Sequence, residues 1–199
     1  MKKKSGRLII ISAPSGAGKT TVVEALLAAS PELKRSVSYT PRSPRGGEKK
    51  GIDYYFISEE EFLRKRKRGF FLEWAKVFGQ FYGTSKAACL DLIARGFGVV
   101  LTIDVQGMRK LTKKLSRKIP IATIFLMPPS MEALKIRLFN RKTDRPAEIK
   151  KRLRIAEEEI RARREYDHVV VNRKVNDSVR RLKRILKLDR QSKQAKEGV

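Results

Sequence analysis

The sequence predicts a single-domain α/β fold built around a parallel central sheet, and three observations lead to this prediction. Four short apolar runs are rich in β-branched residues, as strands buried on both faces of a parallel sheet are. Stretches of helical periodicity separate these runs, and strands that alternate with helices are typical of an α/β sandwich. The length of 199 residues fits one domain.

The elements follow in order along the chain. The expected strands are Arg7–Ser12, Gly98–Ile103, Ala122–Leu126 and His168–Val171. The expected helices are Lys19–Ala29, Ser85–Ala94, Met108–Leu115, Ser130–Phe139, Ala147–Glu165 and Ser178–Leu188. Each helix lies between two strands or after the last one, so the strands can pair in parallel through helical crossovers.

Two regions interrupt this alternation. Residues 38–84 contain turn residues and aromatic pairs with little helical periodicity, and they are too many for a loop, so they predict an inserted subdomain. Residues 137–154 are rich in arginine and predict a mobile lid. The core is then expected over 1–37, 85–136 and 155–190, and a basic tail over 191–199.

The charge of the chain restricts its partners. It carries 47 Lys and Arg against 21 Asp and Glu, a formal net charge of +26, which attracts nucleic acids, anionic lipids or small phosphorylated molecules. The basic stretches 64–69 and 180–198 lack the interleaved aromatic residues of a base-stacking surface. A solvated basic surface is therefore the simpler interpretation, and a secondary nucleic-acid-binding role stays an alternative.

Cysteine, histidine and hydropathy exclude further classes. The one cysteine, Cys89, excludes an internal disulfide, suits a reducing cytosol and is expected to be a buried small hydrophobe. The one histidine, His168, excludes a histidine-cluster metal site. No stretch approaches the ~20 apolar residues that cross a bilayer, and the apolar run near the start is too short for a secretory signal. We expect a cytoplasmic protein without a membrane segment.

The stretch SAPSGAGKTT, Ser12 to Thr21, predicts a phosphate-binding loop between a strand and a helix. In such a loop glycines let backbone N–H groups converge on phosphate oxygens, a lysine reaches the β- and γ-phosphates, and a hydroxyl binds Mg²⁺. Gly16, Gly18, Lys19 and Thr20 supply these groups. The expected triphosphate-binding residues are Ala13, Pro14, Ser15, Gly16, Ala17, Gly18, Lys19, Thr20 and Thr21, with Thr20 as the Mg²⁺ ligand.

Ala13 stands where the motif has its first glycine. That position ends the strand, where alanine is tolerated at negative φ. The motif predicts the fold of a P-loop nucleotide-binding protein, a three-layer sandwich with a parallel sheet. By itself it does not distinguish a kinase from a GTPase or an ATPase.

Spaced motifs that follow the loop bear on that choice. They read SYTPRSPRGGEKKGIDYYF from Ser38, FLEWA from Phe71, FYGTS from Phe81, TIDVQG from Thr102, RKTD from Arg141 and YDHVVVN from Tyr166. In this order, from about residue 8 to 172, the chain resembles the guanylate kinase family. The resemblance implies a Mg²⁺-dependent enzyme that phosphorylates GMP to GDP with ATP, a step that recycles GMP and supplies GTP and dGTP precursors. It also implies dGMP as a further substrate and a monomer or small homo-oligomer.

The resemblance assigns the acceptor site. It implies that Arg42 and Arg45 hold the GMP phosphate, which two close arginines can bind bidentately. Guanine presents two donors at N1 and its exocyclic amine, so a carboxylate is a suitable reader, and the matching residue is Glu73. The complete set of expected GMP-binding residues is Ser38, Arg42, Arg45, Tyr54, Glu73, Tyr82, Thr84 and Asp104, with Thr84 donating to the guanine O6.

Further expectations concern the transfer step. Arg141 and Arg152 match arginines of the family's lid, and with Lys19 we expect them to stabilise charge during transfer. Arg137 and Arg154 are further candidates. Asn172 is expected to contact the adenine.

Three positions depart from the family pattern: Thr102 stands where the family has an acidic residue, Asn140 where it often has glycine, and Arg173 where it usually has an acidic residue. Because Thr102 replaces one of two carboxylates, Asp104 could serve metal or base, or it could cap the next helix. Scaffold proteins contain domains of this kind that bind peptides without catalysis. These generally lack the loop lysine, which this chain keeps.

Overall fold

The structure, a computed structural model, describes residues 6–77, 79–140 and 146–196. The chain divides into two compact units, residues 1–8 with 32–121 and residues 9–31 with 122–199. The boundary passes through the first strand, β1 (Arg7–Ser12), so that Arg7 and Leu8 belong to the first unit and the rest of β1 to the second.

The first unit contains a parallel strand pair and a separate four-stranded sheet. Here β2 (Leu33–Arg35) pairs in parallel with β7 (Gly98–Leu101), and the Arg7 N–H donates to the Phe97 carbonyl 3.2 Å away. The other sheet has the order β4-β3-β6-β5. Its strands are β3 (Ser38–Thr40), β4 (Tyr54–Phe56), β5 (Phe71–Val77) and β6 (Gln80–Ser85). Apart from Ser85, the last residue of β6, all four lie within the residues predicted as an insert, and the division into insert and core stays a prediction.

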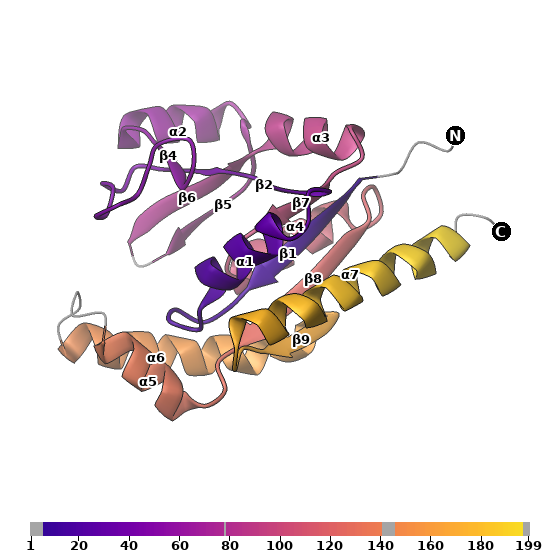
Figure 1. Cartoon of the computed structure of the whole chain (residues 1–199). Coiled ribbons are helices and arrows are strands. Elements are labelled where there is room, and N and C mark those ends of the chain that lie inside the picture. The colour runs from indigo at the N-terminus through magenta and orange to yellow at the C-terminus, as the bar shows by residue number, and fades with distance from the viewer. Residues whose placement is uncertain (1–5, 78, 141–145, 197–199) are drawn as a thin grey trace. The chain divides into compact units, whose positions relative to one another are not determined.

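Three helices complete the first unit: α2 (Glu59–Lys67), α3 (Lys86–Ala94) and α4 (Val105–Leu115). Figure 1 shows α2 beside the four-stranded sheet, against which it buries Phe62 in stacked contacts with Phe71 and Phe81. The list of expected helices contains none in this region, so α2 is a helix that periodicity did not predict. Its signal is in the caps rather than in periodicity: Ser58 accepts from the Glu61 N–H, and acidic residues of the first turn and basic residues of the last turn suit the helix dipole.

The second unit contains the remaining parallel strands in the order β1-β8-β9, with β8 at Ile121–Met127 and β9 at His168–Val171. Its helices are α1 (Lys19–Ala28), α5 (Met131–Phe139), α6 (Pro146–Arg161) and α7 (Val175–Lys196), with a 3₁₀ turn at Ala162–Glu165. In Figure 1, α5 and α6 lie side by side, and they share a buried cluster of Leu134, Leu138, Ile149 and Ala156.

The α/β class with parallel sheet strands is confirmed, and several helix boundaries are corrected. Helix α4 begins at Val105 rather than at the predicted Met108, because Asp104 caps it. Helix α7 runs from Val175 to Lys196 and extends beyond both predicted ends. The residues expected to be a tail from 191 are therefore helical as far as Lys196. Cys89 is fully buried as expected, and burial raises the pKa of its thiol to about 11. Among the described residues no helix is long and apolar enough to cross a membrane.

Candidate active site: a phosphate loop and a carboxylate-bearing sheet

The second unit carries the phosphate loop between β1 and α1. Gly16 and Gly18 adopt φ angles of 91° and 88°, left-handed conformations that residues with side chains rarely enter, as their role in the loop predicts. Lys19 and Thr20 form the first turn of α1, while Ala13 is buried at the strand end. The loop therefore has the strand–turn–helix context that its motif requires.

Two side chains hold the loop through one carbonyl. The Asn172 Nδ2 donates to the Ala17 carbonyl over 2.8 Å, and the Arg137 guanidinium donates to the same oxygen over 3.2 Å. Asn172 also accepts from the Ser178 hydroxyl over 3.0 Å and is only 4% exposed. Because both polar ends of its amide are bonded inside the protein, this side chain fixes the shape of the loop.

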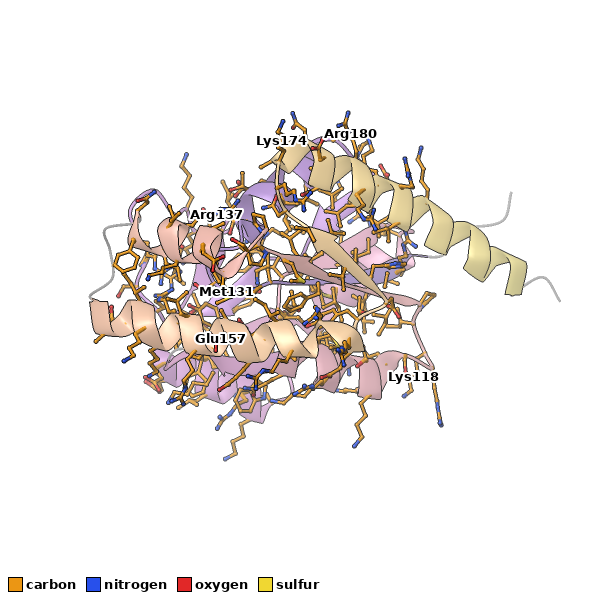
Figure 2. All side chains as sticks on the ribbon, turned by 90° about the horizontal axis from the view of Figure 1, so that it is seen from below. Lys118, Met131, Arg137, Glu157, Lys174 and Arg180 are labelled. Carbon is orange, nitrogen blue, oxygen red and sulfur yellow. The ribbon has the colours of Figure 1, made fainter. Side chains whose placement is uncertain are left out.

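A predicted catalytic arginine also reaches the loop. Arg152, on α6, donates to the Ser15 hydroxyl over 2.9 Å. Its guanidinium thus lies next to the residues on which the phosphates are expected. Figure 2 shows Arg137 on the neighbouring helix α5, and its bond to Ala17 places a second arginine at the loop. Arg141 lies outside the described residues.

The first unit carries four predicted acceptor residues in one row across the sheet. Ser38 on β3 is in register with Tyr54 on β4 and with Thr84 on β6, and Thr84 is in register with Glu73 on β5. Residues directly opposite each other on neighbouring strands project to the same face. Tyr82, two residues before Thr84 on the same strand, belongs to that face as well.

The carboxylate of this row has a perturbed acidity. Glu73 is 7% exposed and accepts a 2.7 Å hydrogen bond from the Thr84 hydroxyl. Burial raises the pKa of Glu73 to about 7; the Thr84 bond opposes this shift, and the charge of Asp104 adds to it. A buried carboxylate with a pKa near neutrality is typical of a functional site. In this structure the Thr84 proton points to Glu73, so Thr84 orients that carboxylate.

The absence of a side chain at Gly107 leaves space for the Glu73 carboxylate. A Cβ at this position would lie 3.2 Å from Glu73 Oε2 and 3.2 Å from Asp104 Oδ1. Asp104 accepts from the Gly107 N–H over 2.7 Å and so caps α4, one of the two roles left open for it by the sequence. The cap does not test whether Asp104 also contacts GMP. Thr102 is half-buried just after β7.

At the other end of the row, Arg42 is held by several groups at once. Its guanidinium donates to the Tyr82 hydroxyl over 3.1 Å and to Glu48 over 2.9 Å, and it lies 5.3 Å from the centre of the Tyr54 ring. The side chain is therefore oriented before any anion arrives, which lowers the entropy cost of binding one. Arg45 is exposed, and its backbone N–H donates to Glu48 over 2.7 Å.

Glu48 is a site residue that the sequence analysis did not single out. Burial opposes its ionisation, but the hydrogen bonds from Arg42 and from the Arg45 backbone outweigh burial and lower the pKa of Glu48. This carboxylate orders the turn that carries both arginines. A signal was present, because Glu48 lies inside the quoted stretch SYTPRSPRGGEKKGIDYYF, directly after the glycine pair Gly46 and Gly47.

One unit carries a phosphate loop with arginines at its rim, and the other carries a sheet with arginines and a buried carboxylate. These two features are typical of P-loop kinases that act on a small phosphorylated substrate. Comparisons with known proteins make the assignment specific. The family model "Guanylate kinase" matches residues 5–189. The chain belongs to the guanylate kinase family.

Individual relatives agree with the family model over nearly the whole chain. The chain is 44% identical over 191 residues to a guanylate kinase of Wolbachia pipientis wMel, covering 96% of this chain and 94% of the relative. It is 45% identical over 184 residues to one of Caldanaerobacter subterraneus subsp. tengcongensis, covering 92% and 88%. The crystal structure of a guanylate kinase from Anaplasma phagocytophilum superposes with a TM-score of 0.79 at 36% identity, covering 94% of this chain and 88% of that one.

Proposed function

We propose that this chain transfers the γ-phosphoryl group of ATP to GMP and releases ADP and GDP. Membership of the guanylate kinase family supports this reaction. The observation that carries it is the row from Tyr54 through Ser38 and Thr84 to Glu73, because it offers hydroxyl groups and an arginine at one end and a buried carboxylate at the other. A nucleoside monophosphate whose base carries two hydrogen-bond donors fits that order of groups.

Recognition of guanine rests on Glu73. When ionised, its carboxylate accepts from guanine N1–H and from the exocyclic amine, whereas adenine presents an acceptor at N1 and is repelled. A site built to hydrogen-bond substrate donors rejects an analogue without them by roughly 10⁴-fold. Tyr54, Tyr82, Arg42 and Arg45 hold the monophosphate. Asp104 and Ser38 complete the acceptor set.

On the donor side, the loop and its arginines carry the transfer. Backbone N–H groups of the loop bind the triphosphate, and Lys19 neutralises the β- and γ-oxygens. Arg152 lies at the loop through Ser15, and with Arg141 it stabilises the charge that spreads over the moving group. A lid over residues 137–154 that closes on the substrates would exclude water, which otherwise competes with GMP for the phosphoryl group.

Mg²⁺ is the cofactor that this chemistry requires. Among the described residues no cluster of three or more His, Cys, Asp or Glu side chains could hold a metal by itself. Mg²⁺ keeps several waters and binds through one or two protein oxygens plus substrate phosphates, so the exposed Thr20 hydroxyl at the start of α1 suits it. Held by Thr20 and the donor's phosphates, the ion would reduce the negative charge that opposes the approach of GMP.

The same assignment extends to the range of substrates and the setting. None of the proposed contacts uses the ribose 2′-hydroxyl, so we expect dGMP to be a substrate too. A cytoplasmic setting agrees with the one buried thiol, Cys89. A monomer or small homo-oligomer is expected, with no nucleic acid needed for activity.

A coupled assay of ADP release tests the function, with GMP, dGMP, AMP, UMP and CMP compared as acceptors at saturating MgATP. We expect turnover with GMP and dGMP, and kcat/KM lower by at least about 10³-fold for AMP. Comparable rates for AMP would overturn the guanine assignment. Tight GMP binding without turnover would support a non-catalytic binding module instead.

A further inference from the structure

A cavity of about 320 Å³ in the second unit adjoins the phosphate loop. Its lining includes Gly16, Gly18 and Thr21 from the loop and α1, Arg137 from α5, and Asn172 and Arg173 from the turn after β9. If the donor's phosphates bind to the loop, as in the proposed function on which this inference rests, the nucleoside continues into this cavity. A volume of this order is sufficient for a small-molecule group.

Asn172 is poorly suited to read the donor's base. Its Nδ2 donates to the Ala17 carbonyl, its Oδ1 accepts from the Ser178 hydroxyl, and 4% of the residue is exposed. Reading a base would require breaking one of these buried bonds and would leave a buried polar group unpaired, which is unfavourable. The expected contact between Asn172 and adenine therefore competes with the role of Asn172 in holding the loop.

The exposed polar side chains at this cavity are of a different kind. Arg173 and Thr21 are exposed, and the described residues that line the cavity include no carboxylate. A guanidinium donates hydrogen bonds and accepts none. It pairs bidentately with guanine, whose O6 and N7 are adjacent acceptors, whereas adenine places a donor amine beside its N7. The cavity therefore offers more to guanine than to adenine.

We propose that Arg173 reads the base of the phosphate donor and that the donor site accepts GTP as well as ATP. In the reaction with GTP, the bond between the γ-phosphorus and the β-bridging oxygen breaks, and a phosphate oxygen of GMP forms the new bond. GTP and GMP thus give two GDP. ATP remains a donor because the loop binds its phosphates and Arg173 can stack on the adenine ring.

The test compares [γ-³²P]GTP and [γ-³²P]ATP at saturating GMP and measures label in GDP. We expect kcat/KM for GTP within about tenfold of that for ATP, and we expect Arg173→Asp to lower the GTP/ATP ratio by at least tenfold, since one bidentate pair is worth about 1–3 kcal/mol. The change should appear in the KM for the donor and leave the KM for GMP unaltered.

Lys174→Asp is the matched control. Lys174 is the next residue, exposed at the start of α7 (Figure 2), and the substitution alters the charge by the same amount outside the cavity lining. A GTP rate below about 1% of the ATP rate in the unaltered protein would overturn the proposal. So would equal shifts of the ratio in the two variants, because these would indicate only long-range charge.

Calorimetric titration of the β,γ-imido analogues of GTP and ATP, with GMP present, separates this proposal from the proposed function. Lack of turnover with ATP and GMP would reject the kinase activity, while the two affinities would still report the base preference. A normal ATP-dependent kinase that does not bind the GTP analogue would reject the role of Arg173 alone.

Discussion

We expect the phosphate loop of the second unit and the four-stranded sheet of the first to bind ligands by different physical means. The loop depends on backbone: two glycines in left-handed conformations and a carbonyl, that of Ala17, fixed by Asn172 and Arg137. The sheet depends on side chains in register, from Tyr54 to Glu73, with a buried carboxylate at its end. We therefore expect the backbone groups of the loop to accept any triphosphate and the side chains of the sheet to select one base.

This difference predicts how substitutions in each region should alter the kinetics. A change at the loop should reduce the rate for every acceptor alike, because it removes charge stabilisation common to all transfers. A change in the sheet should alter which acceptor is used and leave donor binding intact. The predictions below test that separation.

Lys19→Ala should have the largest effect. Without the ammonium group at the β- and γ-oxygens, we expect kcat to fall by about 10⁴-fold, in the range seen for a single cation that stabilises phosphoryl transfer. The KM for GMP should stay within a few fold. Steady-state kinetics with both substrates varied measure this, with Lys174→Ala as the exposed control. An equal loss in the control would remove Lys19 from its role.

Glu73→Gln should damage the sheet selectively. The amide presents one acceptor and one donor to the two donors of guanine, so kcat/KM for GMP should fall by about 10³-fold while the donor's KM is unchanged. The ratio of kcat/KM for GMP to kcat/KM for AMP should decrease at the same time. Glu60→Gln, an exposed carboxylate on α2 of the same unit, is the control. Unchanged GMP kinetics in Glu73→Gln would show that another group reads guanine.

The pH dependence of GMP binding sharpens the comparison further. Burial raises the pKa of Glu73 to about 7, and guanine needs the ionised form. The KM for GMP should therefore rise as pH falls below 7, by up to about tenfold per unit. The donor's KM should not follow this trend. Kinetics between about pH 5.5 and 8.5 measure both, and Glu73→Gln should retain only the dependence due to the phosphate of GMP, with its pKa near 6.

The raised pKa of Glu73 also determines the sign of its effect on the pH dependence of folding stability. The folded pKa of Glu73 lies above its unfolded value, so protonation of this group favours folding fully below the unfolded pKa, and the benefit is lost as pH rises through about 7. Thermal unfolding should show Glu73→Gln gaining stability relative to the unaltered protein as pH increases from 5 to 8. The opposite trend would mean that the carboxylate is stabilised as an anion.

The two regions also differ in how much of them the sequence could predict. The loop is contiguous, and its glycine conformations and its strand–helix context are confirmed because local geometry dictates them. The acceptor residues are up to 66 positions apart, from Ser38 to Asp104, and only the resemblance to a family joined them. Register between strands placed four of them in one row, which no local pattern encodes.

The features that the sequence analysis did not predict, α2 and the role of Glu48, have the same origin. Helix α2 buries one large side chain, Phe62, so its periodicity is weak although its caps are clear. Glu48 acts by bonding two parts of one turn, a role that appears only once the turn is folded. Whether the lid residues Arg141 and Arg152 act in catalysis stays a prediction.

Asn172→Ala should have the smallest effect and is the most direct test of how the loop is held. The substitution removes the amide that bonds the Ala17 carbonyl and leaves the Ser178 hydroxyl without its partner, which should cost about 1–3 kcal/mol of stability. Arg137 still bonds the same carbonyl, so the loop should loosen rather than collapse, and the KM for ATP should rise only about fivefold. Thermal unfolding and donor kinetics measure the two effects, with Ser178→Ala as the control that removes the outer hydrogen bond alone. Since the sheet in the first unit makes none of these bonds, the KM for GMP should not change. A GMP effect as large as the ATP effect would show that loop and sheet do not act as separable sites.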